Sequence, residues 1–181
     1  LPASLGLDIR AFIATIHVAG NRVGELIKRY GVQMVRATMQ RMITVSELRT
    51  RERLLELPDA EIHMADFLEH DGHQNRLYKI DLHMTKSGDS LRLDFSGSST
   101  QAPGFINATR AGLHGGVAGS VIPTLGFDIP WNEGILRPVE IVAPNGLICT
   151  AQHPAPVGSA TVEAIWVINN ITTAAINKLL A

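Results

Sequence analysis

The sequence lacks the features that mark several common classes of protein. Its 181 residues include one cysteine, Cys149, which leaves no internal disulfide and no cysteine pair for a metal. The apolar residues are dispersed, with no run of about 18 that could span a bilayer. No basic segment followed by an apolar one opens the chain, so no secretory signal is expected. These absences predict a protein of a reducing compartment, the cytoplasm, without a membrane partner.

An excess of charge of either sign is also missing. Sixteen Lys and Arg residues stand against seventeen Asp and Glu residues, for a net charge of −1. Nucleic-acid-binding proteins present a basic face, so this balance does not favour that class. With 45% hydrophobic residues, the chain suits one globular domain, or a large piece of one, with a core that needs no disulfides.

The first part of the chain follows the helical period. Apolar residues at spacings of three, four and seven form one stripe, made of Ile9, Phe12, Ile13, Ile16, Val23, Ile27 and Tyr30. Gly31 is expected to end this helix, because glycine adopts the left-handed conformation at no steric cost. A second helix is predicted from Val32 to the break at Pro58. We expect the two helices to pack as an antiparallel hairpin over residues 8–57.

A period of two replaces the helical period after the hairpin. In residues 77–86 polar residues alternate with the apolar residues Tyr78, Ile80, Leu82 and Met84. This pattern predicts a half-buried strand with one face in water. Similar strands at 61–68 and 91–95 are joined to it by glycine-containing turns. The sequence therefore predicts a three-stranded antiparallel meander over residues 61–96.

The remaining residues mix loops with two further helices. Residues 97–158 are loop-rich and include a glycine-rich helix from Asn107 to Leu125, which we expect to be buried because small residues allow close backbone approach. A short hairpin is predicted around Pro144–Gly146. Residues 159–181 form an apolar helix, with Ser159 as its expected cap. Together these elements indicate the α+β class.

Several signatures of catalysis are not found. The sequence has no glycine-rich phosphate loop and no nucleophile elbow, so a nucleotide that drives chemistry must bind elsewhere. Cys149 follows a short apolar strand and is interpreted as a buried, inert thiol. A catalytic cysteine needs a neighbouring base or a helix N-terminus to lower its pKa.

The seven histidines raise the question of a metal site. His70 and His73 flank Asp71 in one turn and could converge as ligands. A turn is a poor platform for ligands, however, so an exposed polar turn is the favoured interpretation and no metal is predicted. The strand pattern also allows His63 and His83 to face each other on the solvent side of the meander, as surface histidines.

Asp94 ends a predicted strand and is followed by a loop of glycine and hydroxyl residues, Ser96–Gln101. A carboxylate in this position can orient a polar group or a water, and the free amides of the loop can cradle an anion. The alternative is an ordinary turn in which Asp94 and the serines cap free amides. Residue chemistry alone favours the turn.

Several segments, in this order, resemble the hydantoinase B/oxoprolinase family. They are Gly6–Ala11, Ile27–Gly31, Leu57–Ala60, Asp71–Gly72, Asp94–Ser99 with Gln101 and Asn107, Pro130–Gly134, Arg137–Pro138 and Pro154–Val157. The family includes B subunits of N-methylhydantoinases, the C-terminal half of 5-oxoprolinase, and subunits of acetone and acetophenone carboxylases. Its members are several hundred residues long. The resemblance therefore implies that residues 1–181 are an internal or C-terminal portion, and that a divalent metal, if present, binds in the preceding N-terminal region.

The resemblance also implies a function, the ATP-dependent opening of a hydantoin- or oxoproline-like cyclic amide. ATP and Mg²⁺ would bind to a hydantoinase A-like partner subunit or domain in a homo- or hetero-oligomer, and the isolated chain is expected to be inactive. Asp94 is the predicted orienting carboxylate or base. The predicted substrate contacts are Gln101, Asn107 and Asn132, with Arg137 as an anion partner.

Two other functions remain open from the sequence. A subunit of an ATP-dependent ketone carboxylase would need the same kind of oxyanion-stabilising pocket, so these residues do not separate it from a hydrolase. A scaffold without chemistry of its own is the third hypothesis. It rests on a mean hydropathy of +0.12 and on the glycine-rich and final helices, whose apolar surfaces could pack against a partner.

Overall fold

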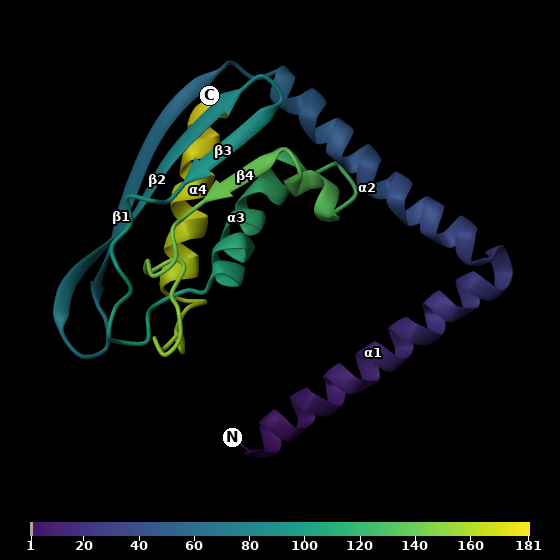
Figure 1. The fold of residues 1–181 in the computed structure, drawn as a ribbon, viewed down its shortest axis with the longest axis horizontal. Coiled ribbons are helices and arrows are strands. Elements are labelled where there is room, and N and C mark those ends of the chain that lie inside the picture. The colour runs from purple at the N-terminus through teal and green to yellow at the C-terminus, as the bar shows by residue number, and fades with distance from the viewer. Residues whose placement is uncertain (1) are drawn as a thin grey trace. The chain divides into compact units, whose positions relative to one another are not determined.

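A computed structural model describes residues 2–181, with side chains from Ser4 onward, and it combines α-helices with one four-stranded sheet (Figure 1). In chain order the elements are α1 (Pro2–Tyr30), α2 (Val32–Leu55), β1 (Ala60–His70), β2 (Asn75–Ser87), β3 (Ser90–Asp94), α3 (Arg110–Leu125), the 3-10 helix η1 (Glu133–Leu136), β4 (Val139–Val142) and α4 (Ala164–Leu180). The predicted α+β class is confirmed. No helix within residues 2–181 combines the length and the hydropathy needed to cross a membrane.

The chain divides after Met42 into two compact units. In the first, Gly31 separates α1 from α2 with a φ of +78°, which confirms the predicted break. The apolar stripe of α1 stays exposed, with Phe12 at 67% and Ile16 at 73% exposure. Among residues 4–42 the buried seam of the predicted hairpin is therefore not formed. In α2 the apolar residues Val32, Met39 and Met42 recur at helical spacing, but their side chains are exposed as well, so they do not cover the stripe of α1.

The second unit, residues 43–181, contains the sheet, whose strands lie in the order β1-β2-β3-β4. Strands β1, β2 and β3 pair antiparallel, which confirms the predicted meander. In this register His63 of β1 pairs with His83 of β2, and His83 pairs on its other side with Asp94 of β3. These three residues therefore share one face of the sheet.

The predicted short hairpin around Pro144–Gly146 takes a different form. Only β4 is a strand, and it pairs parallel with β3. Leu147 instead forms an isolated bridge with Thr100. The reason is local: the turn closes on itself through a 3.1 Å bond from the Gly146 amide to the Thr150 carbonyl, while the open edge of β3 is available to β4.

Helices α3 and α4 lie side by side against one face of the sheet (Figure 1). The alternating residues Tyr78, Ile80, Leu82 and Met84 of β2 are buried on this face, as the period of two predicts. Cys149 is fully buried as well, and burial raises the pKa of its thiol, which agrees with an inert role.

Both helices begin later than predicted. Helix α3 starts at Arg110, three residues after the predicted start at Asn107, because the Thr109 hydroxyl accepts from the Gly112 amide and caps the helix there. Helix α4 starts at Ala164 with no side-chain cap, so Ser159 is not its capping residue. The polar groups of Asn107 serve the preceding loop instead, as described below.

The glycine-rich helix is buried against α4, as its small residues predict. A Cβ added to Gly116 would lie 2.9 Å from Ile168 Cγ2 and 3.2 Å from the Ile165 carbonyl oxygen. Buried residues of α4 such as Ile168, Ile171 and Ile176 belong to the same core. The apolar side of α4 is therefore used inside this unit.

We expect Gly116→Val to lower the free energy of unfolding by about 1–3 kcal/mol, because the added methyls overpack the contact between α3 and α4. Gly115→Val is the matched control, since a Cβ at Gly115 meets no atom within 4 Å. It should change stability by no more than about 0.5 kcal/mol. Chemical denaturation measures both, and equal effects would contradict the close packing of α3 on α4.

Candidate functional site

The face of the sheet opposite α3 and α4 carries a row of polar side chains, which we call the polar face. Because side chains alternate along a strand, residues two apart point to the same side. The polar face comprises His63 of β1, Lys79, Asp81 and His83 of β2, Arg92 and Asp94 of β3, and Glu140 of β4. It includes Asp94, the carboxylate that the sequence singled out.

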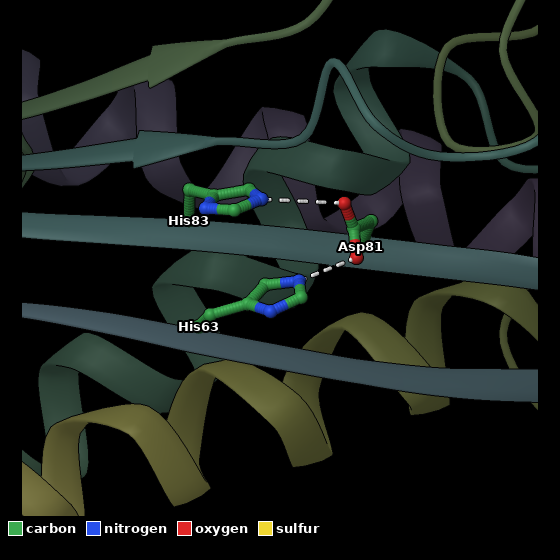
Figure 2. A group of neighbouring side chains, drawn as sticks. All are labelled: His63, Asp81 and His83. Carbon is green, nitrogen blue, oxygen red and sulfur yellow. Dashed lines mark hydrogen bonds and ion pairs between the residues drawn. The ribbon is translucent and has the colours of Figure 1, made fainter.

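Asp81 lies beside the stacked pair of histidines, with one carboxylate oxygen directed at each ring (Figure 2). Its Oδ1 is 2.8 Å from His63 Nε2, and its Oδ2 is 3.5 Å from His83 Nε2. The imidazole rings stack with their centroids 4.1 Å apart, so the two histidines do face each other. Lys79 Nζ lies 3.4 Å from Asp81 Oδ1.

The loop that follows β3 buries Asp81. The hydroxyl of Ser98 accepts a 3.0 Å bond from the Asp81 amide, and the hydroxyl of Ser99 accepts a 2.9 Å bond from the Lys79 amide. Gly97 passes so close that an added Cβ would lie 2.0 Å from Asp81 Oδ2. A side chain at Gly97 would therefore displace the carboxylate.

Asp81 is ionised at neutral pH. Burial raises the pKa of its carboxyl group, but the hydrogen bond to His63 and the charge of Lys79 lower it, and the net shift is downward. Only 5% of the side chain is exposed. The polar face thus holds a nearly buried negative charge whose nearest partners are two imidazoles and one ammonium group.

Asp94 lies on the same face, across from His83. Its Oδ1 accepts a 2.9 Å bond from the Ser96 amide, and its Oδ2 accepts a 2.9 Å bond from Arg92. Burial raises the pKa of Asp94, while the bonds from Ser96 and Arg92 lower it, and the pKa is lowered overall. Asp94 therefore closes the turn as an ordinary capping aspartate does, and it presents an ionised carboxylate beside the histidines.

Gln101 and Asn107 are not part of the polar face. Each forms a hydrogen bond to the loop of residues 152–156. Gln101 Oε1 accepts a 2.9 Å bond from the Gln152 amide and borders a hollow of about 320 Å³. Asn107 is fully buried, and its Nδ2 donates to the carbonyls of Gly104 and Pro156 at 2.9 Å. Its Oδ1 accepts from the Ala102 amide at 2.7 Å. Asn107 thus holds two loops together.

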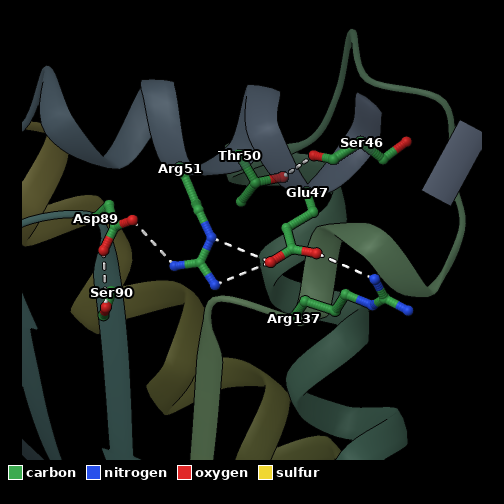
Figure 3. Close-up of polar contacts among 7 residues, drawn as sticks. All are labelled: Ser46, Glu47, Thr50, Arg51, Asp89, Ser90 and Arg137. Atoms are coloured by element: carbon green, nitrogen blue, oxygen red, sulfur yellow. Dashed lines mark hydrogen bonds and ion pairs between the residues drawn. The ribbon is translucent and has the colours of Figure 1, made fainter. Parts of the chain in front are cut away.

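Asn132 and Arg137 are not part of the polar face either. Each forms a hydrogen bond to the C-terminal half of α2. Asn132 donates to the Ser46 hydroxyl at 2.8 Å and caps η1 by accepting from the Gly134 amide. Figure 3 shows Glu47 between Arg51 and Arg137, with the Arg137 bond at 3.1 Å. These bonds, that of Arg51 first, lower the pKa of Glu47. The predicted anion partner is thus already paired with a carboxylate.

The turn with His70 and His73 is organised around Asp71. This buried carboxylate accepts a 2.7 Å bond from the Tyr78 hydroxyl and 2.8 Å bonds from the His73 and Gln74 amides. His70 Nδ1 accepts from the Gly72 amide at 2.8 Å. The arrangement matches the polar-turn interpretation, because the carboxylate is used to close the turn.

Among residues 4–181 the one group of three side chains with metal-ligating atoms close together is His63, Asp81 and His83. The sequence indicated that the two histidines face each other but not the part played by Asp81. The available signal was its position two residues before His83 in the alternating strand. Its burial could not be read from that pattern, because it depends on the loop after β3.

Comparison with known proteins places these observations in a family. The model of the hydantoinase B/oxoprolinase family matches residues 1–181. A putative D-/L-hydantoinase B subunit of Pseudomonas sp. (strain NS671) is 29% identical over 82% of this chain and 27% of its own length. The caprolactamase beta subunit of Pseudomonas jessenii is 30% identical over 82% of this chain and 26% of its own. The chain thus spans about a quarter of the length of these relatives.

Solved structures show the same fold. The crystal structure of the ATP-dependent caprolactamase from Pseudomonas jessenii superposes with a TM-score of 0.84 at 28% identity, over 95% of this chain and 30% of that chain. A nucleotide-free acetone carboxylase gives a TM-score of 0.68 at 18% identity, over 77% of this chain and 20% of that chain. At this lower identity the second likeness concerns the fold alone.

The Asp71 turn generates a pH-dependent prediction. The hydrogen bond from the Tyr78 hydroxyl has the largest effect on the pKa of Asp71. Together with bonds from Gln74 and His73 it holds this pKa far below its ordinary value of 3.8, although burial raises it. A carboxylate with a lowered folded-state pKa contributes stability above its unfolded pKa, and this stability is lost as the pH falls. Asp71→Asn should therefore destabilise the protein at pH 7, and its deficit relative to wild type should shrink below a pH of about 4.

Urea denaturation at neutral and acid pH measures this effect. Asp66→Asn is the control, because Asp66 is exposed and its carboxylate accepts only from the neighbouring Phe67 amide among the bonds found. The control should follow the wild-type pH dependence. A deficit of Asp71→Asn that is the same at both pH values would contradict the role given to the ionised Asp71.

Proposed function

The chain belongs to the hydantoinase B/oxoprolinase family, and we propose that it is part of an ATP-dependent cyclic-amide hydrolase subunit. The observation that carries this proposal is the likeness to the caprolactamase of Pseudomonas jessenii, at 30% identity to its beta subunit in sequence and a TM-score of 0.84 in structure. The proposed substrates are hydantoin-, oxoproline- or lactam-like rings.

The chemistry explains why such a subunit would act within an assembly. An unstrained lactam resists hydrolysis, and phosphorylation of its carbonyl oxygen makes the ring carbon a better electrophile for water. A hydantoinase A-like subunit or domain would bind ATP and Mg²⁺ and transfer the phosphoryl group. The present chain would help to hold the activated ring and to position the water.

Asp94 is the proposed carboxylate for this step. It is ionised, and it lies on the polar face next to His83. Gln101, at the edge of its hollow, is a proposed contact to substrate. For Asn107, Asn132 and Arg137 we propose a positioning role, because their polar atoms bond within the chain.

A ketone carboxylase subunit is the second candidate. The acetophenone carboxylase delta subunit of Aromatoleum aromaticum (strain DSM 19018 / LMG 30748 / EbN1) is 28% identical over 59% of this chain. The hydantoinase and caprolactamase subunits are similar over a larger share of the chain, 82% in each case. This difference in coverage favours the hydrolase.

Turnover by the protein together with its hydantoinase A-like partner tests the proposal. With ATP and Mg²⁺, hydantoin, 5-oxoproline or caprolactam should give ring-opened product without bicarbonate. The chain by itself should give no product above a buffer control, because activation is assigned to the partner. Bicarbonate-dependent consumption of acetone or acetophenone, with no ring opening, would establish the carboxylase in place of the hydrolase.

Asp94→Asn tests the proposed carboxylate. The amide oxygen can still accept from the Ser96 amide, so the turn is kept while the charge is lost. Ring opening by the assembly should fall by about 10²-fold or more. Because the ionised carboxylate is bonded by Arg92, a small loss of thermal stability is expected, and activity is measured at a temperature at which the variant is folded. Glu140→Gln is the control, because Glu140 is an exposed carboxylate that pairs with the same Arg92 at 3.3 Å.

The control variant should keep the wild-type rate. If Asp94→Asn also keeps that rate, Asp94 has no part in the chemistry. Such a result would favour the scaffold hypothesis for residues 1–181.

A further inference from the structure

We propose that His63, Asp81 and His83 form a binding site for a divalent transition-metal ion of the zinc class. This inference rests on the polar face itself and does not depend on the substrate of the assembly. The three ligands lie outside the segments that carry the family likeness. Only Gly97 and Ser98, which pack against Asp81 and hold it in place, belong to one of those segments.

The three side chains have the spacing that a small cation requires. Their ligand atoms all lie within 4.8 Å of one another, and Asp81 is 2.8 Å from His63 Nε2 and 3.5 Å from His83 Nε2. Bonds of about 2.0–2.2 Å to a tetrahedral zinc separate its ligand atoms by about 3.3 Å. Small side-chain shifts would therefore admit the ion between the three atoms (Figure 2).

The ligands stand on a rigid platform. His63 and His83 are direct partners in the ladder between β1 and β2, and Asp81 is two residues from His83 on the same strand. The Asp81 amide is fixed by Ser98, and its carboxylate lies against Gly97. Strand pairing thus fixes the Cα positions of all three ligands. The turn that carries His70 and His73 has no such support from a sheet.

The charge of the cluster favours a cation. Asp81 is ionised and nearly buried, whereas the imidazoles of His63 and His83 are 55% and 61% exposed and free to adjust. Lys79 now lies beside the carboxylate, at 3.4 Å, but its side chain is 40% exposed and can withdraw into solvent. A metal ion would replace the ammonium charge and the hydrogen bond between His63 and Asp81.

The donor set identifies the class of metal. Two imidazole nitrogens and one carboxylate oxygen suit Zn²⁺ and related first-row ions, whereas Mg²⁺ and Ca²⁺ prefer oxygen ligands alone. Three protein ligands leave a coordination position open. A hollow of about 240 Å³ adjoins both histidines, but Asp81 does not line it. The exposed imidazoles leave the cluster accessible to water or a small ligand.

Metal binding by the purified protein tests the proposal. After treatment with a chelator, the wild-type chain should bind one Zn²⁺ ion in equilibrium dialysis that variants of the cluster do not bind. Co²⁺ should give visible absorption bands that Zn²⁺ abolishes. His63→Gln, His83→Gln and Asp81→Asn should each weaken this site by at least about 10-fold, since even changes around metal ligands cost 10- to 100-fold. Thermal unfolding of each variant without metal identifies any that fail to fold, and the exposed histidine variants should fold normally.

His70→Gln is the matched control, because His70 is an exposed histidine outside the cluster. It should bind Zn²⁺ as wild type does. Zinc uptake that is unchanged in His63→Gln and His83→Gln would overturn the proposal. So would NMR signals of the two imidazoles that respond to pH but not to Zn²⁺, because the cluster would then bind protons only.

Discussion

The packing of α3 and α4 against one face of the sheet is the constraint on which the arrangement of residues 43–181 depends. Because side chains alternate along β2, Tyr78 and Leu82 must then enter the core, and Asp81 and His83 must lie on the other face. Polar groups gathered on that face have to satisfy one another or reach water. The contacts among His63, Asp81 and Lys79 follow from this requirement.

The segment Asp94–Ser99 has two roles that cannot be separated in the sequence. Asp94 ends β3 and closes the turn, and the next residues fold back over β2, where Gly97 and Ser98 cover Asp81. A glycine is needed there because of the close approach of the carboxylate. The same segment therefore shapes the polar face and contributes one of its charges, so its resemblance to the family reflects structure as well as any chemistry.

Other polar residues that were predicted to contact the substrate form hydrogen bonds between distant parts of the chain. Buried polar groups are nearly always hydrogen-bonded, and loop-rich regions have many free backbone groups to satisfy. Asn107 meets this need for the loops at Gly104 and Pro156, and Arg137 fastens the chain after η1 to Glu47 of α2. A polar residue within a family motif is thus as compatible with assembly of the fold as with binding.

The sequence by itself determined the elements whose signals are local: the break at Gly31, the meander with its two faces, and the buried glycine-rich helix. It also indicated that His63 and His83 face each other, because hairpin register follows from the alternation. The tertiary structure alone decided the parallel pairing of β4 with β3, the bridge from Leu147 to Thr100, and the burial of Asp81. Each of these features depends on which strand edge or sheet face stays open after distant segments have packed. The local pattern of apolar residues contains no information about that packing.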